Sequence, residues 1–218
     1  VNECPNSVKV IRNDTDKVRM AFLSNRKVIV SLAPSYVSEF IGYEENFVRA
    51  LYKLGFHAVS ETAIGAALVS QALDMYMEDH GEAPFISTAC PSVVELIRKY
   101  FPQDIKSLAP VPSPLQTHSA YLRKLYGNDI VIVFIGPCVA KKIEADEHPG
   151  YPDVALTFRE VREWLEEENI DLANIDTGIP VDFVPAKAGK AAIYPIENGQ
   201  IETSKIWEGR FVEQSALS

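Results

Sequence analysis

The apolar run "IVIVFIG" at residues 130–136 constrains the fold more than any other stretch of the chain. It carries no charge and is rich in β-branched and aromatic side chains, so it predicts a buried strand. The run ends abruptly at Gly136, Pro137 and Cys138, and two lysines and an acid follow closely. We therefore expect a strand whose carboxyl end presents a cysteine among charged groups.

Other strands and helices alternate along the chain. Strands are predicted at residues 26–32, 57–61, 83–90, 129–136 and 152–157. Helices are predicted at residues 45–55, 63–77, 91–101, 115–126 and 158–168. Thr157 and Glu160 form a T-x-x-E capping box for the last helix. The alternation predicts an α/β fold with small, largely parallel sheets flanked by helices.

Two further segments are predicted to be irregular or hairpin-like. The tract "LAPVPSP" at residues 108–114 contains three prolines that cannot donate ladder hydrogen bonds, so it is not an interior strand. Residues 190–211 read as a short hairpin that turns at Asn198 and Gly199.

Composition limits the partners. The 218 residues carry a net charge of −9 with no basic stripe, which disfavours nucleic acid and anionic membranes as partners. No apolar run approaches the roughly 20 residues that span a bilayer. The start of the chain has no signal-peptide pattern. We expect a soluble protein in the cytoplasm.

The three cysteines, Cys4, Cys90 and Cys138, are odd in number and widely spaced. They form no Cys-x-x-Cys pattern, and a disulfide framework is not expected in a reducing compartment. Cys90 and Cys138 each end a predicted strand, which is where α/β proteins gather ligands. From the residues alone, two interpretations stay open: buried structural cysteines, or thiolates that bind a metal cluster.

The sequence around these cysteines resembles the iron-only ([FeFe]) hydrogenase large subunit. The stretches "STACPS" and "GPCVAKKIE" are similar to two cysteine motifs of that family. The stretches "SLAPS", "GFHAVSETAIGAAL" and "LAPVPSPLQTH" are similar to three others, in the family's order. The resemblance covers about residues 5–165. It implies a two-lobed fold, with a first lobe at residues 26–125 and a second at residues 126–218, truncated before the last cysteine motif.

The resemblance also implies roles for individual residues. Cys90 and Cys138 match two of the four cysteines that hold a [4Fe–4S] cluster, which is linked to a two-iron site with CO and CN ligands. Lys141 matches a lysine that donates to a cyanide of that site, and Glu144 matches an acid of the proton path. The loop of Ala33, Pro34 and Ser35 matches one that packs against the two-iron site. Lys142 is expected to be a solvated surface lysine.

Three departures from the family pattern matter. Ala89 stands where catalytic members have the cysteine that passes protons to the two-iron site, so turnover should be slow. No cysteine follows Cys138 to complete the cluster ligands. Cys4 precedes Pro5 as the last cysteine of a bacterial ferredoxin run does, so residues 1–25 read as a remnant of an upstream cluster segment and a linker. Residues 1–218 alone are expected to hold no iron and to show no activity.

Three functions fit this pattern. The first is an H-cluster-type iron–sulfur domain of a redox or H2-sensing protein, favoured by Ala89. The second is a catalytic hydrogenase subunit that oxidises or evolves H2. The third is a scaffold that binds only a [4Fe–4S] cluster or a protein partner. The partners expected with the first two are H2, a ferredoxin-like electron carrier or fused iron–sulfur domain, and a fused signalling module.

Overall fold

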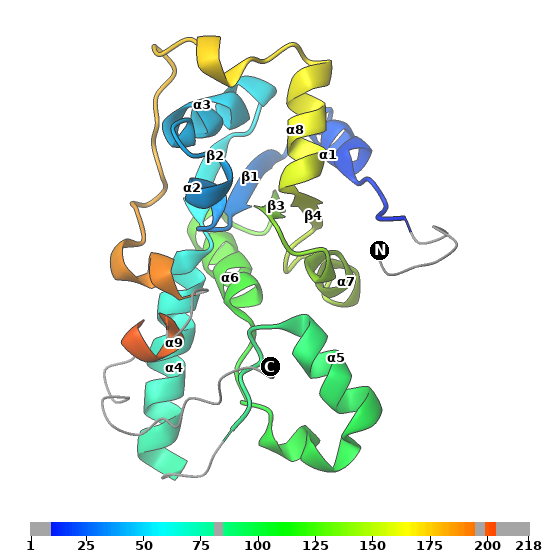
Figure 1. Ribbon diagram of the computed structural model, residues 1–218, viewed down its shortest axis with the longest axis vertical. Helices are drawn as coiled ribbons and strands as arrows, with labels where there is room; N and C mark the ends of the chain where they lie inside the picture. The colour runs from blue at the N-terminus through cyan, green and yellow to red at the C-terminus, as the bar shows by residue number, and fades with distance from the viewer. Residues whose placement is uncertain (1–9, 81–84, 195–198, 204–218) are drawn as a thin grey trace.

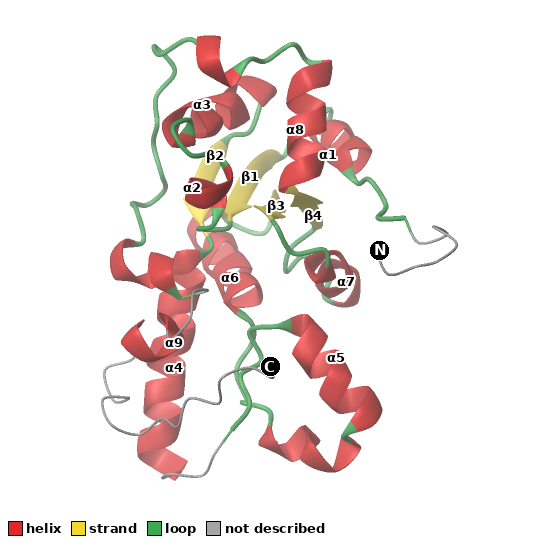
Figure 2. Cartoon of the chain, in the orientation of Figure 1, coloured by secondary structure: helices red, strands yellow, loops and turns green. Residues whose placement is uncertain are grey.

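The computed structural model describes residues 10–80, 85–194 and 199–203, and it confirms the α/β fold with a parallel sheet. Four strands lie in the order β2-β1-β3-β4, and every pair is parallel. Helices surround the sheet (Figures 1 and 2). The strands are β1 (Lys27–Leu32), β2 (Ala58–Glu61), β3 (Ile130–Gly136) and β4 (Val154–Thr157).

Helices make up most of the rest of the described chain. They are α1 (Thr15–Phe22), α2 (Tyr36–Glu39), α3 (Glu44–Leu54), α4 (Ala63–His80), α5 (Pro91–Tyr100), α6 (Pro114–Tyr126), α7 (Ala140–Glu147), α8 (Phe158–Glu167) and α9 (Gly199–Thr203). Three short 3-10 helices are η1 (Pro102–Ser107), η2 (Leu172–Asn174) and η3 (Gly189–Ile193). None of the helices in the described ranges is long and apolar enough to cross a membrane.

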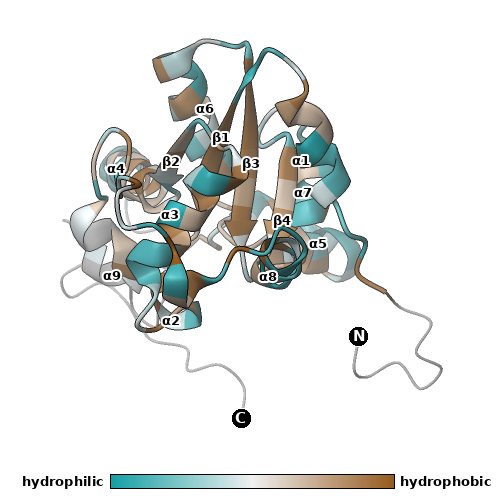
Figure 3. Ribbon diagram, turned by 90° about the horizontal axis from the view of Figure 1, so that it is seen from above, coloured by the Kyte–Doolittle hydropathy of each residue, from teal (hydrophilic) through white to brown (hydrophobic). Residues whose placement is uncertain are grey.

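The sheet is buried on both faces because helices cover each of them. Val28 and Val30 of β1 pack with Phe47 of α3 and Trp164 of α8 on one face. On the other face, Ile29 and Ile132 pack with Leu122 of α6. Figure 3 shows the hydrophobic central strands between these helices. The predicted capping box is present, since Thr157 Oγ1 accepts from the Glu160 backbone and Glu160 Oε2 accepts from the Thr157 backbone.

Residue 126, where the sequence suggests a boundary between two lobes, lies at the end of α6. Strands from both sides of it share one sheet, because β1 and β3 are paired over six residues. The division into lobes stays a prediction.

Two predicted elements are wrong in the part of the chain that the structure describes. Residues 85–90 form no strand but only a single bridge between Ile86 and Leu108. The neighbouring tract continues into three prolines that lack the donors to extend a ladder. In place of the hairpin at residues 190–211, η3 and α9 are helical, with the predicted turn residue Gly199 starting α9. Asn198 lies outside the described residues.

Helices α4 and α6 cross closely at Gly65. A Cβ atom there would lie 2.1 Å from the Pro114 carbonyl oxygen and 2.7 Å from His118 Cβ. We predict that Gly65→Ala lowers the free energy of unfolding by about 1–3 kcal/mol, because the helices must separate to admit the methyl group. Denaturant unfolding measures this. The control, Gln71→Ala at an exposed position of α4, should change stability by less than about 0.5 kcal/mol. Equal stability of the Gly65→Ala protein would contradict the packing.

Candidate active site

Three neighbouring strands end at one side of the sheet and deliver three loops there. The loop Ala33-Pro34-Ser35 follows β1, Thr62 follows β2, and Pro137-Cys138 follows β3. The Ala33 backbone N–H donates to the Ile135 carbonyl at 2.9 Å, which joins the first loop to the end of β3. Gly136 allows this close approach, since a Cβ there would lie 2.8 Å from Ala33 Cβ. The carboxyl ends of parallel strands therefore build one site, as the architecture favours.

These loops line a cavity of about 300 Å³. Its wall includes all but one of the site residues predicted within the described ranges: Ala33, Pro34, Ser35, Ala89, Cys90, Cys138 and Lys141. Cys90 is exposed and Cys138 is half-buried, and neither forms a disulfide. Glu144 lies just behind this wall. Cys4 lies outside the described residues.

Each of the two cysteines lies at the start of a helix. Cys90 is the N-cap residue of α5, and the backbone N–H groups of Val93 and Val94 donate to its carbonyl at 3.1 and 3.2 Å. Cys138 precedes α7, and the Lys141 N–H donates to its carbonyl at 3.2 Å. The two cysteines therefore reach the same cavity from separate loops, each at the start of a helix.

Lys141 connects the cavity wall to Glu144. Its Nζ donates to the Ala89 carbonyl at 3.3 Å and forms a very short ion pair with Glu144 Oε2. Glu144 is buried, and its Oε1 accepts a very short hydrogen bond from the Ser113 hydroxyl. Glu144 also lines a second hollow of about 660 Å³ between α5, residues 110–113 and α7. Lys141 and Glu144 thus form a polar link between the outer hollow and the cavity.

Lys142 corrects a prediction from the sequence. It is buried, not solvated, with 4% of its surface exposed. Its Nζ donates to Asp14 Oδ2 at 2.9 Å, Glu160 Oε1 at 2.8 Å and the Ala155 carbonyl at 2.9 Å. The two adjacent lysines of α7 therefore point in different directions. Lys141 faces the cavity, and Lys142 enters a buried cluster of charged groups.

A buried polar network lies under the cavity and has no counterpart in the sequence-based predictions. The His118 ring, fully buried, contacts Ser31 Oγ through Nδ1 at 2.8 Å and Ser60 Oγ through Nε2 at 2.9 Å. Ser31 Oγ also contacts the hydroxyl of Thr62, a cavity-wall residue, at 2.8 Å. Burial lowers the pKa of His118 to about 3, so the ring is neutral at pH 7. A neutral imidazole has one donor and one acceptor nitrogen, so it can bond both hydroxyl groups. Ser31 in turn holds the Thr62 side chain at the cavity wall.

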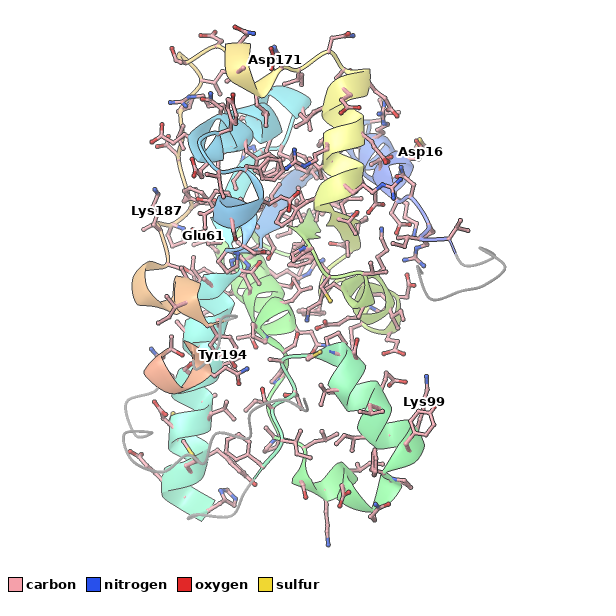
Figure 4. All side chains as sticks on the ribbon, in the orientation of Figure 1. Asp16, Glu61, Lys99, Asp171, Lys187 and Tyr194 are labelled. Atoms are coloured by element: carbon pink, nitrogen blue, oxygen red, sulfur yellow. The ribbon has the colours of Figure 1, made fainter. Side chains whose placement is uncertain are left out.

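Sequence reasoning also missed Ser113 and Tyr194. Ser113 precedes Pro114 and caps α6, a pattern visible in "PSP" that predicts a helix start but not a contact with Glu144. Tyr194 lines the cavity and packs with Ala66, Val69 and Leu73, and Figure 4 labels it beside α4. Its position depends on η3, in a region where the periodicity of the sequence is weak.

The cavity wall supplies half of the protein ligands that an iron–sulfur cluster needs. An iron–sulfur cluster is normally held by four protein ligands, and this wall supplies two cysteines. Within the described residues, no group of three or more Cys, His, Asp or Glu side chains converges to supply the others. Cys90 and Cys138 would hold the cluster, with the Lys141 side chain on the same wall.

Two curated relatives are similar to this chain over most of its length. The NADP-reducing hydrogenase subunit HndD of Solidesulfovibrio fructosivorans is 29% identical over 182 residues, which cover 71% of this chain and 30% of that protein. The cytosolic Fe-S cluster assembly factor NAR1 of Debaryomyces hansenii is 27% identical over 183 residues, which cover 75% of this chain and 33% of that protein. The chain spans about a third of the length of these curated relatives.

A solved structure shares the fold. The apo [FeFe]-hydrogenase HydA1 from Chlamydomonas reinhardtii, variant C377H, superposes with a TM-score of 0.60 at 23% identity. The match covers 81% of this chain and 58% of that one. The family described as "Iron only hydrogenase large subunit, C-terminal domain" matches residues 26–216, and the chain belongs to this family.

Proposed function

We propose that this hydrogenase-like domain holds an H-cluster-type iron–sulfur site and serves in sensing H2 or redox state, not in rapid H2 turnover. One observation carries the proposal. Ala89 lines the cavity beside both cysteines, at the position where the family resemblance puts a proton-passing thiol. A methyl group has no exchangeable proton, so a loaded site would respond to its surroundings with little turnover.

The residues of this chain have distinct parts in the proposal. Cys90 and Cys138 hold the cluster, which when bound stores and passes electrons. Lys141 donates hydrogen bonds into the cavity while its ion pair with Glu144 keeps the ammonium in place. Glu144 accepts a hydrogen bond from the Ser113 hydroxyl at the edge of the outer hollow. Ala89, on the same cavity wall as Lys141, adds no exchangeable proton.

The proposal includes partners that supply and read electrons. A ferredoxin-like carrier or a fused iron–sulfur domain would deliver them, and a fused signalling module would read the state of the site. The curated relatives are more than twice as long as this chain, which leaves room for such parts in a longer protein. The NAR1 relatives are named as cytosolic proteins, and we propose the cytoplasm for this one.

The NAR1 similarity favours a second candidate function. Two relatives of that name are described as cytosolic Fe-S cluster assembly factors. A scaffold of this kind would hold a plain [4Fe–4S] cluster or a partner protein, without a two-iron site. Infrared bands of CO and CN ligands in the matured protein would support the sensor, and their absence in a protein that holds a stable [4Fe–4S] cluster would support the scaffold.

Iron content tests the cluster role that both candidates share. In the full-length protein matured without oxygen, Cys90→Ser and Cys138→Ser should each lower bound iron to less than about half, because a thiolate ligand is lost. The control, Ser92→Ala, changes the exposed second residue of α5, the helix that Cys90 caps, and should keep full iron. Full iron in both cysteine variants, measured by metal analysis, would overturn the ligand assignment and the proposed function.

A further inference from the structure

The short segment of residues 12–14 is bonded to the outer side of α7. Arg12 donates from Nη1 and Nη2 to the two carboxylate oxygens of Asp146 at 2.6 and 2.9 Å. It also donates to the Lys142 carbonyl at 3.4 Å. Both acceptors belong to α7, which is only eight residues long. A planar guanidinium bound at two points fixes orientation as well as position.

Asp14 extends this contact into the interior. It is 2% exposed, and its carboxylate accepts from Arg12 Nε at 2.8 Å and from Lys142 Nζ at 2.9 Å. Its backbone N–H donates to Glu160 Oε1 at 2.8 Å, and Glu160 accepts from Lys142 at 2.8 Å as well. The segment before α1 is thereby joined to α7 and to the start of α8 through charged groups that water does not screen.

Another side of α7 carries the cavity-wall residue Lys141 and its ion-pair partner Glu144. Lys141 and Glu144 are three residues apart and share one side, whereas Lys142 and Asp146 are four apart and share another. Because a short helix turns as one body, its rotation would move both pairs together. In Figure 1, the segment that leads into α1 runs beside α7, and the far side of α7 approaches α5.

We propose that Arg12 and Asp14 are positioning residues that hold α7 so that Lys141, paired with Glu144, faces the cavity, and that they couple the segment before α1 to the site. The geometric part concerns the protein itself, and the coupling part rests on the proposed function. A change in the position of the upstream segment would then alter the donor that Lys141 presents to a bound cofactor. In a sensor, this contact would carry a conformational change between the segment before α1 and the cofactor site, in either direction.

The cofactor-free protein tests the geometric part. Arg12→Gln should raise amide hydrogen exchange in α7 and the rate at which an acylating reagent labels Lys141, each by about threefold to tenfold, while α5 stays unchanged. Asp14→Asn should give a larger rise at the same places. The matched control is Lys17→Gln, because Lys17 also pairs with Asp14, at 2.8 Å, but forms no hydrogen bond or ion pair with the described residues of α7. Equal exchange and labelling in Arg12→Gln and Lys17→Gln would overturn the inference.

The full-length, cluster-loaded protein tests the coupling part. Arg12→Gln should keep full iron but shift the midpoint potential or the infrared bands of the site, and Lys17→Gln should shift neither. Full iron with unshifted spectra in Arg12→Gln would overturn the coupling while leaving the proposed function in place. If the unmutated protein binds no iron above the Cys90→Ser level, the proposed function and the coupling both fail, whereas the exchange results still decide the geometric part.

Discussion

Replacing Lys142 by methionine is expected to lower the free energy of unfolding by about 3–5 kcal/mol at pH 7, because it leaves two buried carboxylates without their shared cation. Asp14 and Glu160 are 2% and 5% exposed, and Lys142 Nζ lies within 3 Å of both. The loss should fall toward the lower end of this range. Arg12 and Lys17 still neutralise Asp14, and the Thr157 hydroxyl and N–H still bond Glu160.

The same variant should change how stability depends on pH. Burial alone would raise the pKa of Asp14, but hydrogen bonds from Arg12, Lys17 and Lys142 outweigh it and lower the pKa to about 2. The pKa of Glu160 is likewise raised by burial and lowered overall by Lys142 and Thr157. A carboxyl group with a lowered pKa stabilises the fold above its ordinary pKa of about 4, and that contribution disappears as the pH falls toward the folded value. The stability difference between the two proteins should therefore be largest at pH 7 and shrink below about pH 4.

Denaturant unfolding at pH 7 and pH 3 measures both effects. The control is Lys124→Met, since Lys124 is exposed on α6 and should matter by less than about 0.5 kcal/mol. A loss below about 1 kcal/mol for Lys142→Met at pH 7 would mean that the buried charges of Lys142, Asp14 and Glu160 give the fold no net stabilisation.

The elements that the sequence predicted correctly are those whose signals are local. The apolar runs of β1 and β3, and the Thr157–Glu160 capping box, depend on residues within a few positions of one another. Lys142 shows the opposite case. Its partner Asp14 lies 128 positions away, and nothing local distinguishes a lysine that enters the interior from its neighbour Lys141, which faces the cavity.

The residues of the candidate site also fall into two groups: those with a local sequence signal and those whose positions depend on distant parts of the chain. The strand tips at Cys138 and at Ala33–Ser35 followed from apolar runs that end at turn residues, and the structure brings both to one cavity with Cys90. Tyr194 and the His118 network could not be predicted, because their positions depend on how α4 and α6 pack against the sheet. Residues 85–90 form no strand, although one was predicted there, because an apolar pattern says nothing about whether a partner strand can pair beside it.

Introducing a thiol at position 89 should have a larger effect on function than any other single change. In the full-length, matured protein, we expect Ala89→Cys to raise H2 turnover by about 10²–10⁴-fold, the usual contribution of a positioned acid–base group. Lys141 already bonds the Ala89 carbonyl at 3.3 Å, and Glu144 is bonded to Lys141. A thiol at this point of the cavity wall would add the exchangeable proton that the methyl group lacks, with an ordinary pKa of about 8.5.

Two controls separate proton transfer from the mere addition of a polar group. Ala89→Ser has a similar size but a far weaker acid, so it should give a smaller rise than the cysteine. Ala66→Cys places a thiol elsewhere on the same wall and should leave turnover low. A water molecule at position 89 in the unmutated protein would reduce the expected ratio, provided that two to four polar groups hold it there. If Ala89→Cys leaves turnover unchanged while infrared bands show the CO and CN ligands in both proteins, proton delivery does not pass through this position. The sensory function would then lose the observation that carries it.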